Sequence, residues 1–348
     1  MRTVNVLVLL HGITLKNTPD DHTDEYDRLW NALKKRQRTL ESAVARVVRI
    51  EWGHEPPKAG PPNIALPNTA PDGLRDDQRI MRAENFIDDV TRHDRVRADR
   101  SPHNHPLGAG PEPSLAYLTR LFSKFVLRPL VLTPIKRQVM VRGLADAVYY
   151  SSPDGERAAR RAVYGQLLAG LGPHENDAVR LHVVAHSLGV TVAFDFLYGL
   201  FAGYDGEPDF IAENETSDDP EVLGAVNRYR LWREKAEHGG LRLGSKASAG
   251  GQLPLLLMRK QKLVDQLARR ETLGVDVIGI RPGDGVKWKI FYDPDDALGF
   301  PTRRLFADQA AVQEYEVETG WNPVAAHAGY WYNPLVQREI ADLIVNNL

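Results

Sequence analysis

One serine stands in a setting that could turn its hydroxyl into a nucleophile. Ser187 lies within the pentapeptide 185–189, which runs Ala-His-Ser-Leu-Gly. The spacing matches G-x-S-x-G, in which the serine occupies a sharp turn between a strand and a helix and projects its hydroxyl above the sheet. Alanine replaces the first glycine here; it keeps that position small but lacks glycine's access to positive φ. The alternative interpretation is a serine that caps an ordinary helix.

A serine hydroxyl reacts slowly until a base removes its proton, and that base needs a partner that orients it. His327 lies in a run of small residues, 325–329, which leaves its imidazole room to reach a serine. We therefore predict His327 as the general base. The alternative is a loop histidine that packs against Tyr330 and Trp331. His186 is expected to flank the turn, because adjacent residues on a tight turn point in different directions.

Three aspartates, Asp293, Asp295 and Asp296, follow the apolar stretch 288–292. Catalytic groups gather at the carboxyl ends of strands in open α/β sheets. We favour Asp296 as the acid that orients the base, because the apolar pair after it can anchor the loop; Asp295 and Asp293 are the alternates. The resulting chain order of serine, aspartate and histidine is the one that accompanies G-x-S-x-G turns.

A negative charge that develops on a substrate carbonyl needs two backbone N–H donors. One comes from the residue after the nucleophile and one from a loop after an early strand. Leu188 follows the serine, and Ile13 follows the apolar stretch 4–10. We expect these two N–H groups to form an oxyanion hole, with Gly12 allowing close approach of the backbone and His11 shaping the loop. A strand that merely ends in a glycine turn is the alternative.

The composition is that of a soluble globular protein, with 43% hydrophobic and 26% charged residues among 348. The formal net charge of −2 indicates no nucleic-acid partner. The absence of cysteine excludes disulfides, thiol nucleophiles and thiolate metal sites, and is typical of a reducing compartment. The apolar stretch 4–10 lacks a cleavage site after it, and no run approaches the ~18 apolar residues of a membrane span. We expect a cytoplasmic protein without metal or cofactor.

Strands must alternate with helices to position these residues. The hydrophobic pattern predicts strands at 4–10, 46–52, 146–150, 179–185, 241–245, 287–292 and 315–318, and helices at 25–45, 154–171, 190–201 and 335–345, with a further helix ending near 270. This alternation predicts an α/β class, with a mostly parallel central sheet flanked by helices.

Two segments interrupt that alternation, at about 56–143 and 204–238, and are predicted as cap or lid insertions in a single domain. The first is rich in proline, and the second begins with an acidic stretch, 204–221, without Lys or Arg. Within the first, 115–140 is apolar and basic, which suits a lid or a peripheral membrane contact. The alternative, favoured by its two prolines, is that it packs on the core. We expect 204–221 to be an exposed loop.

The serine turn, the aspartates and the histidine, together with the His-Gly loop at 11–12, resemble an α/β-hydrolase-fold serine hydrolase of the lipase and esterase type. The resemblance follows the chain in order but does not cover the two insertions. It implies transfer of an acyl group from a small-molecule or lipid ester to water through an acyl-enzyme. Thioester hydrolysis and acyl transfer to another acceptor would use the same residues, and a non-catalytic binding scaffold is a further alternative. The oligomeric state stays open.

Overall fold

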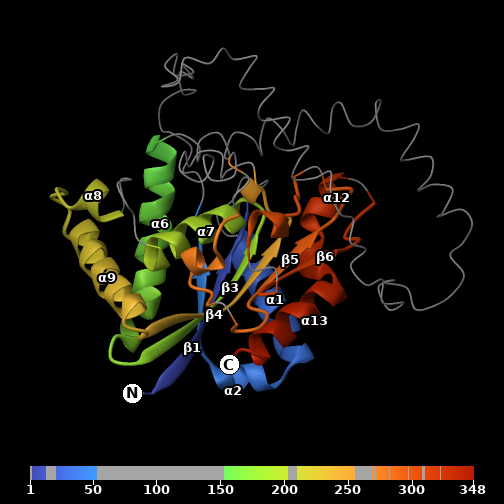
Figure 1. Ribbon diagram of the computed structural model, residues 1–348, viewed down its shortest axis with the longest axis horizontal. Helices are drawn as coiled ribbons and strands as arrows, with labels where there is room; N and C mark the ends of the chain where they lie inside the picture. Colours follow the sequence, from blue (N-terminus) through green and yellow to red (C-terminus); the bar gives the residue numbers. More distant parts are fainter. Residues whose placement is uncertain are drawn as a thin grey trace, which may run out of the picture.

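A parallel sheet of six strands forms the centre of the protein (Figure 1). The computed structural model describes residues 2–12, 21–52, 153–202, 210–254, 269, 272–281, 283–296, 298–307, 310–321 and 323–348. The strands are β1 (Thr3–Leu10), β2 (Val44–Ile50), β3 (Ala178–His186), β4 (Leu241–Ala249), β5 (Trp288–Tyr292) and β6 (Val312–Glu316). Their order across the sheet is β2-β1-β3-β4-β5-β6, and every neighbouring pair is parallel.

Helices cover both faces of this sheet, as Figure 1 shows. One face carries α1 (Asp21–Arg36), α2 (Thr39–Ala43) and α13 (Pro334–Val345); the other carries α6 (Pro153–Leu171), α7 (Leu188–Phe201), α8 (Phe210–Asn214) and α9 (Pro220–Glu237). A shorter helix, α12 (Pro323–Ala328), and the 3₁₀ turns η1 (Gly172–His174), η2 (Val275–Ile278), η3 (Arg303–Leu305) and η4 (Tyr330–Tyr332) complete the described elements. Each face of the sheet therefore has its own apolar core, which explains why the strands are continuous apolar runs rather than alternating ones.

The carboxyl ends of the strands lie together along one edge of the sheet. In register, Leu10 pairs with Ala185, His186 with Ala249, and Ala249 with Phe291. The chain passes from β1 to β2 and then returns to β3 on the other side of β1, so the strand order reverses between β1 and β3. Ligands in open α/β sheets bind outside the carboxyl ends at such a reversal. The loop after β1 and the turn after β3 meet at this point.

The architecture confirms the expected α/β class, and several boundaries differ from the sequence prediction. The single helix expected at 25–45 is two helices, α1 and α2, because the chain turns at residues 37–38 and β2 already begins at Val44. The strand expected at 241–245 continues to Ala249. The acidic stretch expected as an exposed loop contains α8, whose Phe210 is buried in the core.

Several predictions fall outside the described residues. These are the strand at 146–150, the insertion at 56–143 with its apolar and basic segment 115–140, and most of the helix expected to end near 270. Of the second insertion, 210–238 is described, and α9 packs on α6, α7 and β4 through buried residues that include Tyr229 and Trp232. Within the described chain, no helix combines the length and apolarity needed to cross a membrane.

Candidate active site

Ser187 occupies a strained turn between β3 and α7. Its backbone has φ 55° and ψ −132°, and it has the single positive φ of a non-glycine residue in the described chain. Such a conformation costs an L-residue roughly 1–3 kcal/mol and persists only where neighbouring structure imposes it. The N–H of Ser187 donates to the carbonyl of Ala249 at 2.9 Å, which ties the turn to the end of β4. The serine therefore leaves the sheet at a fixed angle.

Two glycines let the loop after β1 interlock with this turn. A Cβ atom on Gly12 would lie 2.1 Å from the Cβ of Ser187 and 2.7 Å from its Oγ. A Cβ atom on Gly189 would lie 2.3 Å from the carbonyl oxygen of His11. Because real Cβ atoms do not approach other atoms so closely, both positions require glycine. The main chain of the first loop thus passes directly against the serine.

The predicted base and acid lie in line with the serine. Ser187 Oγ is 2.7 Å from His327 Nε2, and His327 Nδ1 is 3.0 Å from both carboxylate oxygens of Asp296. An ionised carboxylate can accept hydrogen bonds but cannot donate one. The proton between His327 and Asp296 is therefore assigned to Nδ1, which leaves Nε2 to accept the proton of the serine hydroxyl. The three side chains can therefore pass a proton from oxygen to imidazole while the carboxylate holds the ring in place.

Asp296 is held by further donors. The N–H of Leu298 donates to Oδ1 at 2.8 Å, and the hydroxyl of Tyr330 donates to Oδ2 at 2.9 Å. Burial and the nearby Asp296 carboxylate raise the pKa of Tyr330, so its phenol keeps its proton. Two glycines leave room for these groups, because a Cβ on Gly250 or Gly299 would lie 3.1 Å or 2.5 Å from Oδ2 of Asp296. These donors and close neighbours hold the carboxylate of Asp296 in one orientation.

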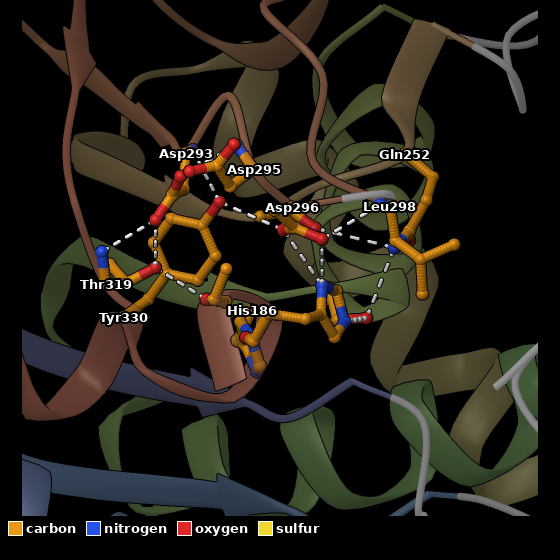
Figure 2. A network of polar contacts seen from close by, with 12 residues as sticks. His186, Gln252, Asp293, Asp295, Asp296, Leu298, Thr319 and Tyr330 are labelled. Carbon is orange, nitrogen blue, oxygen red and sulfur yellow. Dashed lines mark hydrogen bonds and ion pairs between the residues drawn. The ribbon is translucent and has the colours of Figure 1, made fainter. Parts of the chain in front are cut away.

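The other two aspartates have different surroundings, as Figure 2 shows. Asp293 accepts hydrogen bonds from the N–H of Thr319 at 2.6 Å, the hydroxyl of Thr319 at 2.8 Å and the N–H of Asp295 at 2.9 Å. Burial nevertheless raises the pKa of Asp293. The N–H of Asp293 donates to the hydroxyl oxygen of Tyr330 at 2.7 Å, so this tyrosine joins the two aspartates. Asp293 thus organises the loop, whereas Asp296 contacts the histidine.

His186 holds the backbone that carries His327. Its Nε2 donates to the carbonyl oxygen of His327 at 2.8 Å, and the two rings lie 5.1 Å apart. Burial, with a smaller contribution from His327, lowers the pKa of His186 to about 4, so the ring is neutral near pH 7. The hydroxyl of Thr319 lies 2.6 Å from the carbonyl oxygen of Ala326 and 2.8 Å from Oδ2 of Asp293, and its single proton is donated to one of these two acceptors at a time.

The loop after β1 is fixed by His11. Its Nδ1 donates to the carbonyl of Gly12 at 2.6 Å, and its backbone N–H donates to the hydroxyl of Tyr26 at 2.8 Å. Burial, followed by the neighbouring His22, lowers the pKa of His11 to about 3. Ile13, the expected donor of one oxyanion N–H, lies outside the described residues. Leu188 is the first residue of α7, so its N–H has no partner within the helix.

Three residues of this site were not predicted from the sequence, namely Tyr330, Thr319 and Gln252. The sequence predicts Tyr330 only as a packing neighbour of His327. Gln252 is 6% exposed, and its Nε2 lies 3.3 Å from Ser187 Oγ. A signal was present, because Gln252 follows β4 at the same edge as the serine and the aspartates. It was missed because the predicted strand ended before Ala249.

In the described chain, no three His, Cys, Asp or Glu side chains are grouped as a metal ion would require. Searches of protein-family models, of curated proteins and of solved structures found no match to this chain.

Proposed function

We propose that this protein is a serine hydrolase with an α/β-hydrolase fold, which cleaves a carboxylic ester through an acyl-enzyme on Ser187. The observation that carries the proposal is the chain of contacts from Ser187 Oγ to His327 Nε2 at 2.7 Å and from His327 Nδ1 to Asp296 at 3.0 Å. A histidine with a purely structural role could contact either the serine or the aspartate. A buried serine, a partly buried imidazole and a buried carboxylate in this order have the geometry of nucleophile, base and orienting acid.

The backbone around the serine supports the same proposal. A serine with φ 55° at a strand-to-helix turn matches the strained nucleophile turn of the G-x-S-x-G motif. The turn lies where the strand order reverses, which is the usual ligand site of an open parallel sheet. Gly12 brings the backbone of the first loop against the serine, next to where a second oxyanion donor is needed.

The reaction then proceeds in two halves. His327 takes the proton of Ser187 as Oγ bonds to the carbonyl carbon, and the charge on the carbonyl oxygen is held by backbone N–H groups that include Leu188. The C–O bond to the leaving alcohol breaks as His327 returns the proton to it. Water, deprotonated by the same histidine, next attacks the acyl carbon and frees Ser187 and the carboxylic acid. Asp296 stays ionised and steadies the imidazolium in both halves.

Reaction with a fluorophosphonate tests this proposal, because only an activated serine attacks such a reagent at an appreciable rate. Mass spectrometry of the intact protein is expected to find one adduct, on Ser187. The adduct is expected to be absent from Ser187→Ala and from His327→Ala, and retained in the control Ser42→Ala, whose serine lies on α2 and donates only to the carbonyl of Thr39 at 3.2 Å. Hydrolysis of short-chain esters is expected to follow the same pattern. An unlabelled wild-type protein that is folded by circular dichroism would contradict the proposal.

A further inference from the structure

The turn after β4 places a polar side chain against the nucleophile. Gly250 has φ 57°, and a Cβ on Gly251 would lie 2.8 Å from Val190 in α7, so the chain passes tightly over the first turn of that helix. The N–H of Gly250 donates to the carbonyl of Phe291 and the N–H of Phe300 donates to the carbonyl of Gly251, at 2.9 Å and 3.0 Å. The side chain of Gln252 leaves this rigid turn and points into the network around Asp296 (Figure 2).

The positions of the protons around Ser187 decide how the amide of Gln252 is used. His327 Nε2 accepts the serine proton, because its Nδ1 donates to Asp296. Ser187 Oγ is then left with lone pairs and accepts from Gln252 Nε2 at 3.3 Å. The same nitrogen lies 3.4 Å from the carbonyl oxygen of Gly250, which takes its second proton. The amide nitrogen is therefore committed to the nucleophile and to the turn.

The amide oxygen has no such use. Gln252 Oε1 is buried, and no donor among the described residues reaches it. A buried acceptor without a partner destabilises the free protein, so a bound molecule that brings a donor to this atom supplies the hydrogen bond that the free protein lacks. Nε2 and Oε1 belong to one planar amide, so a donor to Oε1 lies close to the carbonyl that Ser187 attacks.

We infer that Gln252 is a specificity-determining residue that selects acyl groups bearing a hydroxyl on the carbon next to the carbonyl or on the following carbon. This inference rests on the proposed function. The hydroxyl donates to Oε1, while Nε2 keeps its contact with the nucleophile. A plain acyl chain leaves Oε1 unpaired, and a site built to pair a buried polar group discriminates against a substrate that cannot do so.

A ratio of rates isolates this contact. We would measure kcat/KM for para-nitrophenyl butanoate and for its alpha-hydroxy and beta-hydroxy analogues, in the wild type and in Gln252→Met. The methionine side chain has a similar length and lacks the amide. Loss of the Nε2 contact with Ser187 lowers the rates of all three esters together, and the intrinsic reactivity of each ester cancels between proteins. Only loss of the Oε1 contact changes the ratio of hydroxylated to plain ester.

We expect at least one of the two ratios to fall about threefold to tenfold in Gln252→Met, which is the worth of one hydrogen bond. Gln252→Asn, whose amide is one methylene shorter and fits the site without crowding, is expected to lose the preference as well. Gln313→Met is the matched control, because Gln313 lies exposed on β6 and its side-chain oxygen accepts from the hydroxyl of Tyr315 at 2.9 Å, away from Ser187. It is expected to keep all three rates.

Two results would overturn the inference, and they are distinguishable. If Ser187 reacts with the fluorophosphonate but both ratios are the same in wild type, Gln252→Met and Gln252→Asn, the role of Gln252 is wrong and the proposed hydrolase stands. If the wild type shows neither labelling at Ser187 nor Ser187-dependent cleavage of the plain ester, the proposed function fails and the inference fails with it.

Discussion

Tyr330 is the residue that joins the acid of the site to the rest of the loop after β5. Its hydroxyl donates to Asp296 and accepts from the N–H of Asp293, at 2.9 Å and 2.7 Å. The ring is fully buried beside His186, with ring centroids 5.8 Å apart. This hydroxyl therefore acts with the N–H of Leu298 to orient the carboxylate that contacts His327.

Removing that hydroxyl should leave the carboxylate of Asp296 less firmly oriented. In Tyr330→Phe the N–H of Asp293 loses its partner and Asp296 loses one of its donors, so we expect the free energy of unfolding to fall by about 1–3 kcal/mol. We expect kcat/KM for a plain ester to fall about tenfold, mainly through kcat, because a reoriented carboxylate holds the imidazole less well. Urea unfolding and steady-state kinetics measure the two effects.

The matched control is Tyr332→Phe, because Tyr332 lies two residues away and is 51% exposed. It should change neither quantity measurably. An unchanged kcat in Tyr330→Phe, together with the expected loss of stability, would reduce Tyr330 to a purely structural role.

At the scale of residues, the sequence could predict side chains that belong to a recognisable catalytic motif. It could not predict side chains whose role comes from the residue that they contact in the folded protein. Residue type and chain order point to Ser187, His327 and Asp296, and the structure brings all three together. A tyrosine or a glutamine carries no such signal, because each is as often a packing or surface residue. Tyr330 and Gln252 became visible only when folding put them against Asp296 and Ser187.

At the scale of elements, the site depends on the contact between the loop after β1 and the turn after β3. Gly12→Ala should abolish that contact, since the added Cβ would meet the Cβ of Ser187 at 2.1 Å. Either the first loop or the serine must move, so we expect kcat/KM to fall at least about a hundredfold, as on loss of an oxyanion donor. Labelling of Ser187 should slow in parallel, while circular dichroism stays native.

Gly165→Ala provides the comparison, because a Cβ at this position of α6 meets nothing within 4 Å. This change should keep full activity and raise the free energy of unfolding by about 0.5–1 kcal/mol, since alanine is the better helix former. Full activity in Gly12→Ala would show that the close approach of the two loops is dispensable.

The pairing of β4 with β5 buries an amine among aromatic rings. Lys246 is fully buried, and its Nζ lies 4.0 Å from the ring centre of Trp288, with no hydrogen-bond partner among the described residues. Burial lowers the pKa of Lys246 well below its usual range, so folding must strip a proton from it or bury the charge. We therefore expect Lys246→Met to raise the free energy of unfolding by about 1–3 kcal/mol, measured by urea unfolding near pH 7.

Lys289 on β5 gives the opposite test. Its Nζ lies 2.7 Å from Glu339 Oε2, so Lys289→Met would remove the nearer cation from a half-buried carboxylate and leave it with Arg338, which lies 3.5 Å from Oε1 and is more exposed. We expect that change to lower stability by about 1–3 kcal/mol. A loss of stability in both variants would mean that Lys246 contributes to the core through its contacts with the aromatic rings.

Strand β4 also shows why some elements escaped prediction. Residues 245–248 read Ser-Lys-Ala-Ser, which is typical of a loop. In the structure Ser245 contacts His182 at 2.8 Å, and Ser248 accepts from the indole of Trp288 at 2.9 Å. Polar side chains with partners on neighbouring strands can be buried in a sheet, but the partners are 40 or more residues away in the sequence. Local pattern therefore ended the strand too early.

For the molecule as a whole, the sequence predicted the alternation of strand and helix and hence the parallel sheet. The order of the strands lies beyond such a pattern, because it depends on which side of β1 each later strand joins. That order is nevertheless what brings Gly12, Ser187 and Asp296 to one edge, since β1, β3 and β5 all end there. The order of serine, aspartate and histidine along the chain could be matched to a type of reaction. Their arrangement in space had to come from the structure.

Three histidines among the described residues fold in the neutral form. Burial lowers the pKa of His11 and His182 to about 3 and of His186 to about 4, from an ordinary value of 6.5. Below pH 6.5 the unfolded chain binds a proton at each that the native protein does not bind. Their contribution to stability is therefore complete above pH 6.5 and is lost as the pH falls toward about 4.

Each neutral histidine should steepen the loss of stability by up to about 1.4 kcal/mol per pH unit within this window. Urea unfolding between pH 7 and about pH 5 measures the slope. His182→Gln removes one titrating group that lies away from the site. The slope of stability against pH in this variant should therefore be smaller by the amount that one bound proton contributes, whatever the variant's stability at pH 7. The carboxylates, including Asp293, whose burial raises its pKa, contribute equally to the slopes of the wild type and the variant. Their contribution therefore drops out of the difference between the two slopes. Equal slopes would mean that His182 is protonated in the native protein, and its contacts with Ser245 and Asn5 would then have to be those of an imidazolium.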